Sequence, residues 1–195
     1  PYSLLSMNQR KRQNFENKVW EHYRKHDPAL PWRKTKNPYH IFVSEVMLQQ
    51  TQIPRVLIKY PQFLKEFPTV KALAKTPLRR ALSAWSGMGY NRRAFYLQEA
   101  ARNIIKKHGG KIPKDVQALD MLPGIGPYSA RAIVCFAYNA CEPFIETNIR
   151  RVIIHEFFGR KKNVSDNEIL RVLETVEPAR NKREWYWALM DYGRE

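Results

Sequence analysis

Three separated groups of residues suggest chemistry in this sequence. The first is the glycine-rich turn Leu122-Pro123-Gly124-Ile125-Gly126, which is followed by Pro127 and an apolar run. Two glycines close together, with a proline that opens the next helix, describe a tight hairpin that presents backbone N–H groups at a helix start. Such a hairpin can grip a phosphate. The distant Glu45 and Glu146 then suggest acid–base work on the molecule that carries the phosphate.

The two glutamates stand in different local surroundings. Glu45 lies inside the apolar run Ile41–Leu48, so burial is expected to raise its pKa and to keep it protonated, as a general acid requires. Glu146 precedes Thr147, the expected N-cap of a helix, where backbone N–H groups favour a charged carboxylate. One neutral acid and one anion are used when a glycosidic bond breaks. The alternatives are a surface glutamate at Glu45 and a simple helix cap at Glu146.

Composition indicates the class of partner. The 195 residues include 34 Lys and Arg against 18 Asp and Glu, so the formal net charge is +16 and the pI is about 10.0. This excess favours a polyanion, with nucleic acid as the leading candidate. An anionic membrane surface would attract the same charge, but no run approaches the roughly twenty apolar residues of a spanning helix. We expect a soluble intracellular monomer, in the cytoplasm with the nucleoid or in a eukaryotic nucleus.

The cysteines and histidines predict no metal site. Cys135 lies inside the apolar segment Ala132–Ala137, and Cys141 follows shortly after it. A disulfide framework or a thiolate metal site needs more thiols or nearby histidines, so both cysteines are expected to be small buried hydrophobes. Only His22 and His26 share a helical spacing, without a third ligand.

The periodicity and the capping signals are helical throughout, and no alternating strand pattern occurs. Short helices are expected to begin at the N-caps Thr69 and Thr76, and another is expected over Asp115–Met121. The longer helices are expected over Asn14–Lys25, Asn37–Gln50, Pro54–Phe67, Arg92–Lys107, Pro127–Tyr138, Asn148–Phe158, Ser165–Val176 and Arg183–Tyr192.

The helix, glycine turn and helix together resemble a helix–hairpin–helix element, which binds a DNA backbone without reading bases. Alone, the turn would also suit a purely structural role, a polymerase or a repair scaffold. The segments Pro31-Trp32-Arg33, Ser44–Gln52, Trp85–Tyr90 and His108-Gly109-Gly110 extend the likeness. In this order they resemble the MutY-type adenine DNA glycosylases of the helix–hairpin–helix base-excision superfamily, over nearly all of residues 31–193.

The resemblance implies an all-α fold of two helical lobes with a DNA-binding cleft between them. One lobe would span residues 33–140 and include the hairpin, and the other would combine residues 1–32 with 141–195. These enzymes usually carry four cysteines after the segment that matches Met190–Gly193 and a C-terminal domain that recognises 8-oxoguanine. Here the chain ends at Glu195. We therefore expect no iron–sulfur cluster and no other cofactor, although the hairpin could hold a monovalent cation.

The resemblance also implies catalytic roles. Glu45 would protonate the adenine. Glu146 and Asn148 fall where the family has Asp-x-Asn, so Glu146 would stabilise the sugar cation or form a transient adduct. Its extra methylene shifts the carboxylate by about 1 Å, which can cost two orders of magnitude in rate. Tyr128 stands where bifunctional relatives such as endonuclease III carry a nucleophilic lysine. A phenol cannot form a Schiff base, so no lyase activity is expected, and Tyr128 would hydrogen-bond a catalytic carboxylate.

Further residues match DNA contacts of the family. Gln49, Gln50 and Tyr90 match side chains that intrude into the base stack. Thr51 and the hairpin residues Leu122, Gly124 and Gly126 would contact the backbone. The combined positive charge of several cations indicates phosphate binding more strongly than any single one does. These candidate phosphate contacts are Arg92, Arg93, Lys106, Lys107, Lys111, Lys114, Arg150, Arg151, Arg160, Lys161 and Lys162.

These features predict a monofunctional DNA glycosylase that flips a mispaired base and hydrolyses its N-glycosidic bond. Adenine opposite 8-oxoguanine or guanine is the first substrate expected. The alternatives are a thymine or uracil glycosylase acting on mismatches with guanine, because Tyr128 suits both, and a noncatalytic protein that binds damaged DNA.

Overall fold

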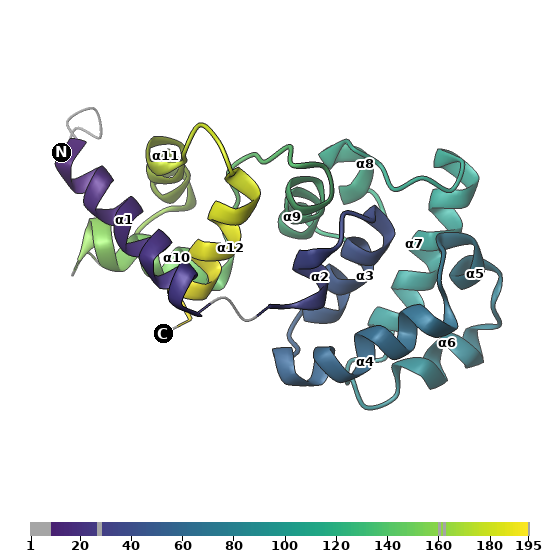
Figure 1. Cartoon of the computed structure of the whole chain (residues 1–195). Coiled ribbons are helices and arrows are strands. Elements are labelled where there is room, and N and C mark those ends of the chain that lie inside the picture. The colour runs from purple at the N-terminus through teal and green to yellow at the C-terminus, as the bar shows by residue number, and fades with distance from the viewer. Residues whose placement is uncertain (1–8, 27–28, 160, 162, 195) are drawn as a thin grey trace. The chain divides into compact units, whose positions relative to one another are not determined.

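A computed structural model describes residues 9–26, 29–159, 161 and 163–194 (Figure 1). The described residues form helices and connecting turns without a strand, so the all-α prediction is confirmed. The chain divides into two compact units. We call residues Ala29–Ala140 the hairpin unit, and residues Pro1–Pro28 with Cys141–Glu195 the terminal unit.

Three helices of the hairpin unit begin at side-chain caps. The Asn37 side chain accepts from Tyr39 N at 3.0 Å, the Thr69 hydroxyl from Ala72 N at 3.1 Å, and Asp115 Oδ2 from Ala118 N at 2.7 Å. The N-cap predicted at Thr76 is wrong, because the helix that follows has Pro77 as its N-cap and no side-chain cap. Its helices are α2 (Pro31–Lys34), α3 (Pro38–Leu48), α4 (Ile53–Glu66), α5 (Val70–Lys75), α6 (Leu78–Trp85), α7 (Arg92–His108), α8 (Val116–Asp120) and α9 (Pro127–Tyr138).

Helix α3 forms the centre of the hairpin unit. It is buried from Ile41 to Met47 without interruption, which is expected of a helix that is apolar on all sides. It packs against α4, α7 and α9. Phe42, Val43 and Met47 are fully enclosed. A side chain on this helix is therefore held rigidly and away from water, which matters for Glu45.

The terminal unit combines the first described helix with the last ones. Its elements are α1 (Gln9–His26), α10 (Thr147–Ile153), the π-helix η2 (Ile154–Phe158), α11 (Asp166–Val176) and α12 (Lys182–Tyr192). Phe15 of α1 meets Trp185 of α12 edge-to-face at 5.9 Å, and Phe144 stacks on Tyr186 at 4.4 Å. The capping box between Ser165 and Glu168 forms as the sequence indicates. No described helix has the length and apolar character needed to cross a membrane.

The prediction for the cysteines is wrong. Cys135 is buried as expected, but Cys135 and Cys141 are disulfide-bonded rather than two free thiols. Since the chain has two cysteines, they pair with each other. Cys135 lies near the end of α9, and Asn139 ends that helix in the left-handed conformation.

Candidate functional site

The glycine hairpin joins α8 to α9 as a tight turn. Ile125 N donates to Leu122 O at 3.1 Å, and Gly124 adopts a φ of 75°. Leu122 and Ile125 are 4% and 6% exposed, so their side chains anchor the turn in the core. Leu122 can therefore offer DNA its backbone but not its side chain.

The two hairpin glycines are needed for different reasons. A Cβ on Gly124 would lie 2.7 Å from Tyr96 Cβ, and its positive φ disfavours any L side chain. Gly126 has ordinary backbone angles, and a Cβ there would meet nothing within 4 Å. Gly126 is the N-cap of α9, and no side chain caps that helix. The space over the first turn of α9 is thus left open for an external acceptor.

Alanine substitutions separate these two functions. Gly124→Ala is expected to destabilise the fold by about 1–3 kcal/mol because it combines backbone strain with a steric overlap. Gly126→Ala should leave the unfolding midpoint unchanged and weaken binding of undamaged duplex, because its methyl group occupies the approach to the amides. Urea unfolding and fluorescence anisotropy measure the two effects. Wild-type affinity in Gly126→Ala would rule out a phosphate at this helix start.

Glu45 is placed on the buried helix α3 and is 6% exposed. It is one of few buried polar residues in the described chain, together with Ser44, Thr76, Gln98, Ser129 and Asp191. The neighbouring Ser44 hydroxyl donates to Ile41 O at 2.8 Å. The alternative of a surface glutamate is therefore excluded, and the burial expected of a general acid is present.

Gln49 connects the end of α3 to the hairpin. Its Nε2 donates to Gly124 O at 3.2 Å and to Ser129 Oγ at 3.1 Å. The carbonyl of Gly124 and the first turn of α9 are thereby linked to the end of the helix that carries Glu45. The predicted intrusion of Gln49 into a base stack would require it to give up these bonds.

Gln50 and Tyr90 are better placed for intrusion. Both residues are exposed, Tyr90 to 66%. Both also adopt positive φ angles, 53° for Gln50 and 47° for Tyr90. Left-handed backbone at non-glycine residues costs free energy and concentrates at functional sites. We call Gln49, Gln50 and Tyr90, the residues predicted to enter the base stack, the predicted wedge. Gln50 and Tyr90 are exposed and free to enter a base stack, whereas the Gln49 side chain is held by the hairpin.

Arg92 and Arg93 differ although they are adjacent. Arg92 is exposed, and its guanidinium donates to the Tyr96 hydroxyl at 3.2 Å. Arg93 turns inward and donates to several protein oxygens, among them Thr51 Oγ1 at 2.8 Å. The terminal nitrogens of Arg93 are occupied by these oxygens, so the phosphate contact predicted for it needs correction. The α-helical repeat explains the difference, because consecutive residues point about 100° apart.

Glu146 is itself the N-cap of α10, one residue before the predicted cap Thr147. Its carboxylate accepts from Asn148 N at 2.7 Å and from Ile149 N at 3.3 Å, and Asn148 Nδ2 donates to it at 3.2 Å. Burial raises the pKa of Glu146, and these backbone hydrogen bonds oppose that rise without cancelling it. The cap favours the anion, as predicted, whereas the loss of solvation favours the neutral acid and leaves the pKa above its ordinary value.

The raised pKa of Glu146 predicts a pH effect on stability. A protonated Glu146 stabilises the fold; this contribution is complete below the ordinary value of 4.5 and is lost as the pH rises through the raised pKa. Glu146→Gln keeps a neutral acceptor, so wild type should lose stability relative to this variant over that range. Urea midpoints at a series of pH values measure the difference, with Glu174→Gln on α11 as the exposed control. A pH-independent difference would contradict this account.

The backbone next to Glu146 is supported by the end of α12. A Cβ on Gly193 would lie 2.2 Å from Asn148 O, and Arg151 donates to Gly193 O at 2.9 Å. Gly193 is the C-cap of α12 and has a φ of −81°, so glycine is needed there for this close approach rather than for a positive φ. Sequence analysis missed this contact, because nothing in the pattern near residue 193 points to residue 148.

The remaining predicted site residues lie at helix starts or in surface ion pairs. Tyr128 is the second residue of α9 and is half-buried. Arg150 forms an ion pair with Asp166 at 2.6 Å, and Lys161 is paired with Glu168. Arg160 and Lys162 lie outside the described residues. Within the part of the chain that the structure describes, no group of three His, Cys, Asp or Glu side chains could hold a metal ion.

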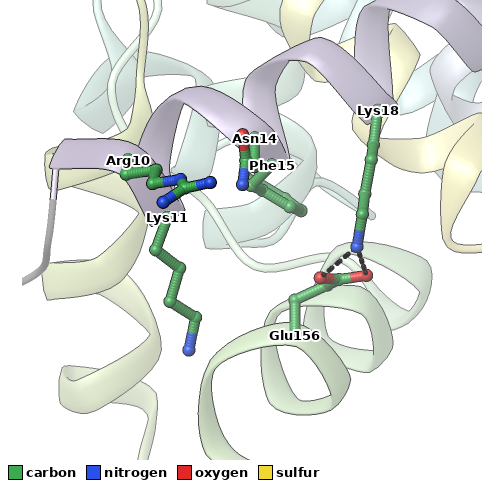
Figure 2. Close-up of a pocket in the computed structure, with 6 residues that line it drawn as sticks. All are labelled: Arg10, Lys11, Asn14, Phe15, Lys18 and Glu156. Atoms are coloured by element: carbon green, nitrogen blue, oxygen red, sulfur yellow. Dashed lines mark hydrogen bonds and ion pairs between the residues drawn. The ribbon is translucent and has the colours of Figure 1, made fainter.

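A separate pocket of about 320 Å³ lies in the terminal unit (Figure 2). Lys11 and Lys18 extend from one face of α1, and Lys18 Nζ pairs with Glu156 Oε2 of η2 at 3.2 Å. None of the predicted catalytic residues lines this pocket, so it adds positive charge without being a candidate for the reaction. Its lining consists of Arg10, Lys11, Asn14, Phe15, Lys18 and Glu156.

Comparison with known proteins agrees with this geometry. Residues 43–179 match the family model of the HhH-GPD superfamily of base excision DNA repair proteins. The chain belongs to this superfamily. The match includes Glu45, the hairpin and Glu146, so the candidate residues lie in the shared region.

Named relatives include more than one kind of glycosylase. An adenine DNA glycosylase of Mycobacterium tuberculosis is 42% identical over 139 residues, which cover 71% of this chain and 46% of the relative. A thymine/uracil-DNA glycosylase of Methanothermobacter thermautotrophicus is 31% identical over 167 residues, 84% of this chain and 76% of the relative. The chain spans about half the length of the curated adenine DNA glycosylases that it matches.

Solved structures support the fold. A thermostable thymine-DNA glycosylase superposes with a TM-score of 0.86 at 29% identity, over 94% of this chain and 86% of that chain. Endonuclease III in a non-covalent DNA complex gives a TM-score of 0.74 at 22% identity, over 93% and 84% of the two chains. The helix–hairpin–helix glycosylase fold predicted from sequence is confirmed.

Proposed function

We propose that this chain is a monofunctional DNA glycosylase that acts as a monomer, without a cofactor, on duplex DNA containing a mispaired base. The observation that carries the proposal is a buried carboxyl, Glu45, on a helix linked by Gln49 to the helix–hairpin–helix turn. A turn that holds a phosphate and an acid sheltered from water supply the two requirements for excising a flipped base.

The proposed reaction assigns one step to each side chain. Protonated Glu45 donates its proton to a ring nitrogen of the flipped base, and the N-glycosidic bond then breaks with its electron pair leaving on the base. The carboxylate of Glu146 stabilises the positive charge that develops on the sugar, and Asn148 Nδ2 orients that carboxylate. Water adds to the sugar carbon and loses a proton to the Glu45 carboxylate, which leaves an abasic site and restores the acid.

Adenine opposite 8-oxoguanine or guanine is the first substrate proposed. It is supported by the 42% identity to an adenine DNA glycosylase. Thymine or uracil opposite guanine is the second candidate, favoured by the TM-score of 0.86 with a thymine-DNA glycosylase. Duplexes with A·8-oxoguanine, A·G, T·G and U·G, followed by alkali cleavage, separate these alternatives. Release of thymine or uracil without adenine would contradict the first choice, and tight binding without release would indicate a noncatalytic damage-binding protein.

The tyrosine at position 128 predicts that strand cleavage by elimination does not occur. A phenol cannot form the Schiff base that a lysine amine forms with the sugar. Borohydride added during turnover should therefore trap little covalent protein–DNA product, while alkali should still cleave the abasic strand. Efficient trapping would show that another amine of the chain acts as a nucleophile.

A further inference from the structure

The Arg93 side chain connects three segments of the hairpin unit. It extends from the first turn of α7 and donates through Nη1 to Val46 O at 3.2 Å and to Met47 O at 3.0 Å, at the C-terminal end of α3. Through Nη2 it donates to Thr51 Oγ1 and, at 3.1 Å, to Met88 O. These partners lie at the end of α3, in the segment that follows it, or in the turn that precedes α7.

Two further hydrogen bonds of Arg93 hold the backbone immediately before Gln50 and Tyr90. Nη1 donates to Gln49 O, and Nη2 donates to Gly89 O at 3.2 Å. These are the carbonyls immediately before Gln50 and Tyr90, the two exposed residues with positive φ. One guanidinium therefore fixes the peptide plane that leads into each left-handed residue, and the Tyr90 ring lies 5.7 Å from its central carbon.

The position of Arg93 is not one that favours a cation. The first turn of α7 carries the positive end of its helix dipole, which opposes positive charge. Burial lowers the pKa of the Arg93 guanidinium, and its Nε is buried without a hydrogen-bond partner among the described residues. The compensation comes from the C-terminal carbonyls of α3, where a cation is favoured, and from the Trp85 ring at 5.3 Å.

We propose that Arg93 is a positioning residue that holds Gln50 and Tyr90 in the conformation needed to enter the base stack before DNA binds. This inference rests on the proposed function, because it assigns Gln50 and Tyr90 to base flipping. Preorganisation of this kind removes an ordering cost from the step in which the base leaves the helix. A flexible lysine at position 93 keeps the charge but cannot donate to both carbonyls in the same planar geometry.

Arg93→Lys should slow single-turnover base release by about 10²-fold, the cost of a misplacement near 1 Å. Its affinity for undamaged duplex and the salt dependence of that affinity should stay within error. A phosphate contact would instead weaken every duplex and reduce the salt slope by about one. Arg102→Lys is the matched control on the same helix, because Arg102 also donates to a carbonyl, Ala74 O at 3.1 Å. A reduced salt slope with normal base release would overturn the proposal.

A measurement on the DNA-free protein keeps this test independent of the proposed function. In Arg93→Lys, amide hydrogen exchange should accelerate at residues 49–51 and 88–91, and Arg102→Lys should show no change there. Thr51→Val removes one acceptor of Arg93 and should accelerate the same amides to a smaller extent, which decides the question if Arg93→Lys does not fold. Unchanged exchange in these segments would overturn the proposal. Altered exchange in a protein that releases no base from any duplex would contradict the proposed function alone.

A double-mutant cycle tests whether Arg93 acts through Tyr90. If it does, Arg93→Lys should cost much less in a Tyr90→Ala background than in wild type, because the residue being positioned has been removed. Equal costs in both backgrounds would show that Arg93 does not act through the Tyr90 ring.

Discussion

Glu45→Gln is expected to slow single-turnover base release by at least about 10²-fold, the lower end of what a positioned general acid contributes. Glutamine has nearly the same size and keeps hydrogen-bonding capacity, but it has no acidic proton to transfer to the base. Glu45 is 6% exposed on α3, so water cannot easily replace it as the proton donor. Quenched-flow release assays measure the rate, and anisotropy should give duplex affinity within about twofold of wild type.

The matched control is Glu66→Gln on α4. Glu66 is a surface glutamate that pairs with Arg80 at 2.7 Å, so its neutralisation should leave base release unchanged. Comparable losses in both variants would point to a general charge effect. Full activity in Glu45→Gln would remove Glu45 as the acid.

Gly193→Ala is expected to disturb the backbone around Glu146, which the alanine substitutions at Gly124 and Gly126 do not touch. The new Cβ would lie 2.2 Å from Asn148 O, and a backbone atom cannot move aside as a flexible side chain can. Either α12 or the first turn of α10 must shift, which displaces the residue that orients Glu146. Overpacking typically costs about 1–3 kcal/mol, so we expect a Tm several degrees lower and a loss of base release beyond that of a merely destabilised protein.

Gly126→Ala serves as a control for Tm alone, because its Cβ would meet nothing within 4 Å. Base release is compared between Gly193→Ala and wild type only, well below both unfolding transitions, which separates activity from stability. A Gly193→Ala protein with wild-type Tm and wild-type base release would show that the contact between residues 193 and 148 has no role in the site.

Local signals in the sequence were sufficient for most of the helices and for the hairpin, although the short helix α2 was not predicted. Asn37, Thr69 and Asp115 accept the backbone bonds expected of caps, and Gly124 has the positive φ that a tight turn requires. These features depend on neighbours within a few residues, so they are visible as patterns. The burial of Glu45 was predictable for the same reason, since its run of apolar neighbours admits no polar face.

Features that depend on distant contacts were not predictable. Arg93 looked like one more surface cation, and its partners at Val46 and Gln49 become neighbours only when α7 packs on α3. The cap of Glu146 was predictable from its neighbours, but burial, which the local sequence does not reveal, decides the direction of its pKa shift. The disulfide was missed because the small number of cysteines was taken as evidence against any disulfide.

The central claim is that this chain breaks N-glycosidic bonds in mismatched DNA, and mass spectrometry of the small-molecule fraction tests it most directly. The full chain is incubated in excess over duplexes that contain A·8-oxoguanine or T·G, beside Glu45→Gln and a fully paired duplex. We predict free base from a mismatched duplex with wild type alone, in an amount equal to the abasic sites formed. Absence of free base from every mismatched duplex, or equal release by Glu45→Gln, would contradict the claim.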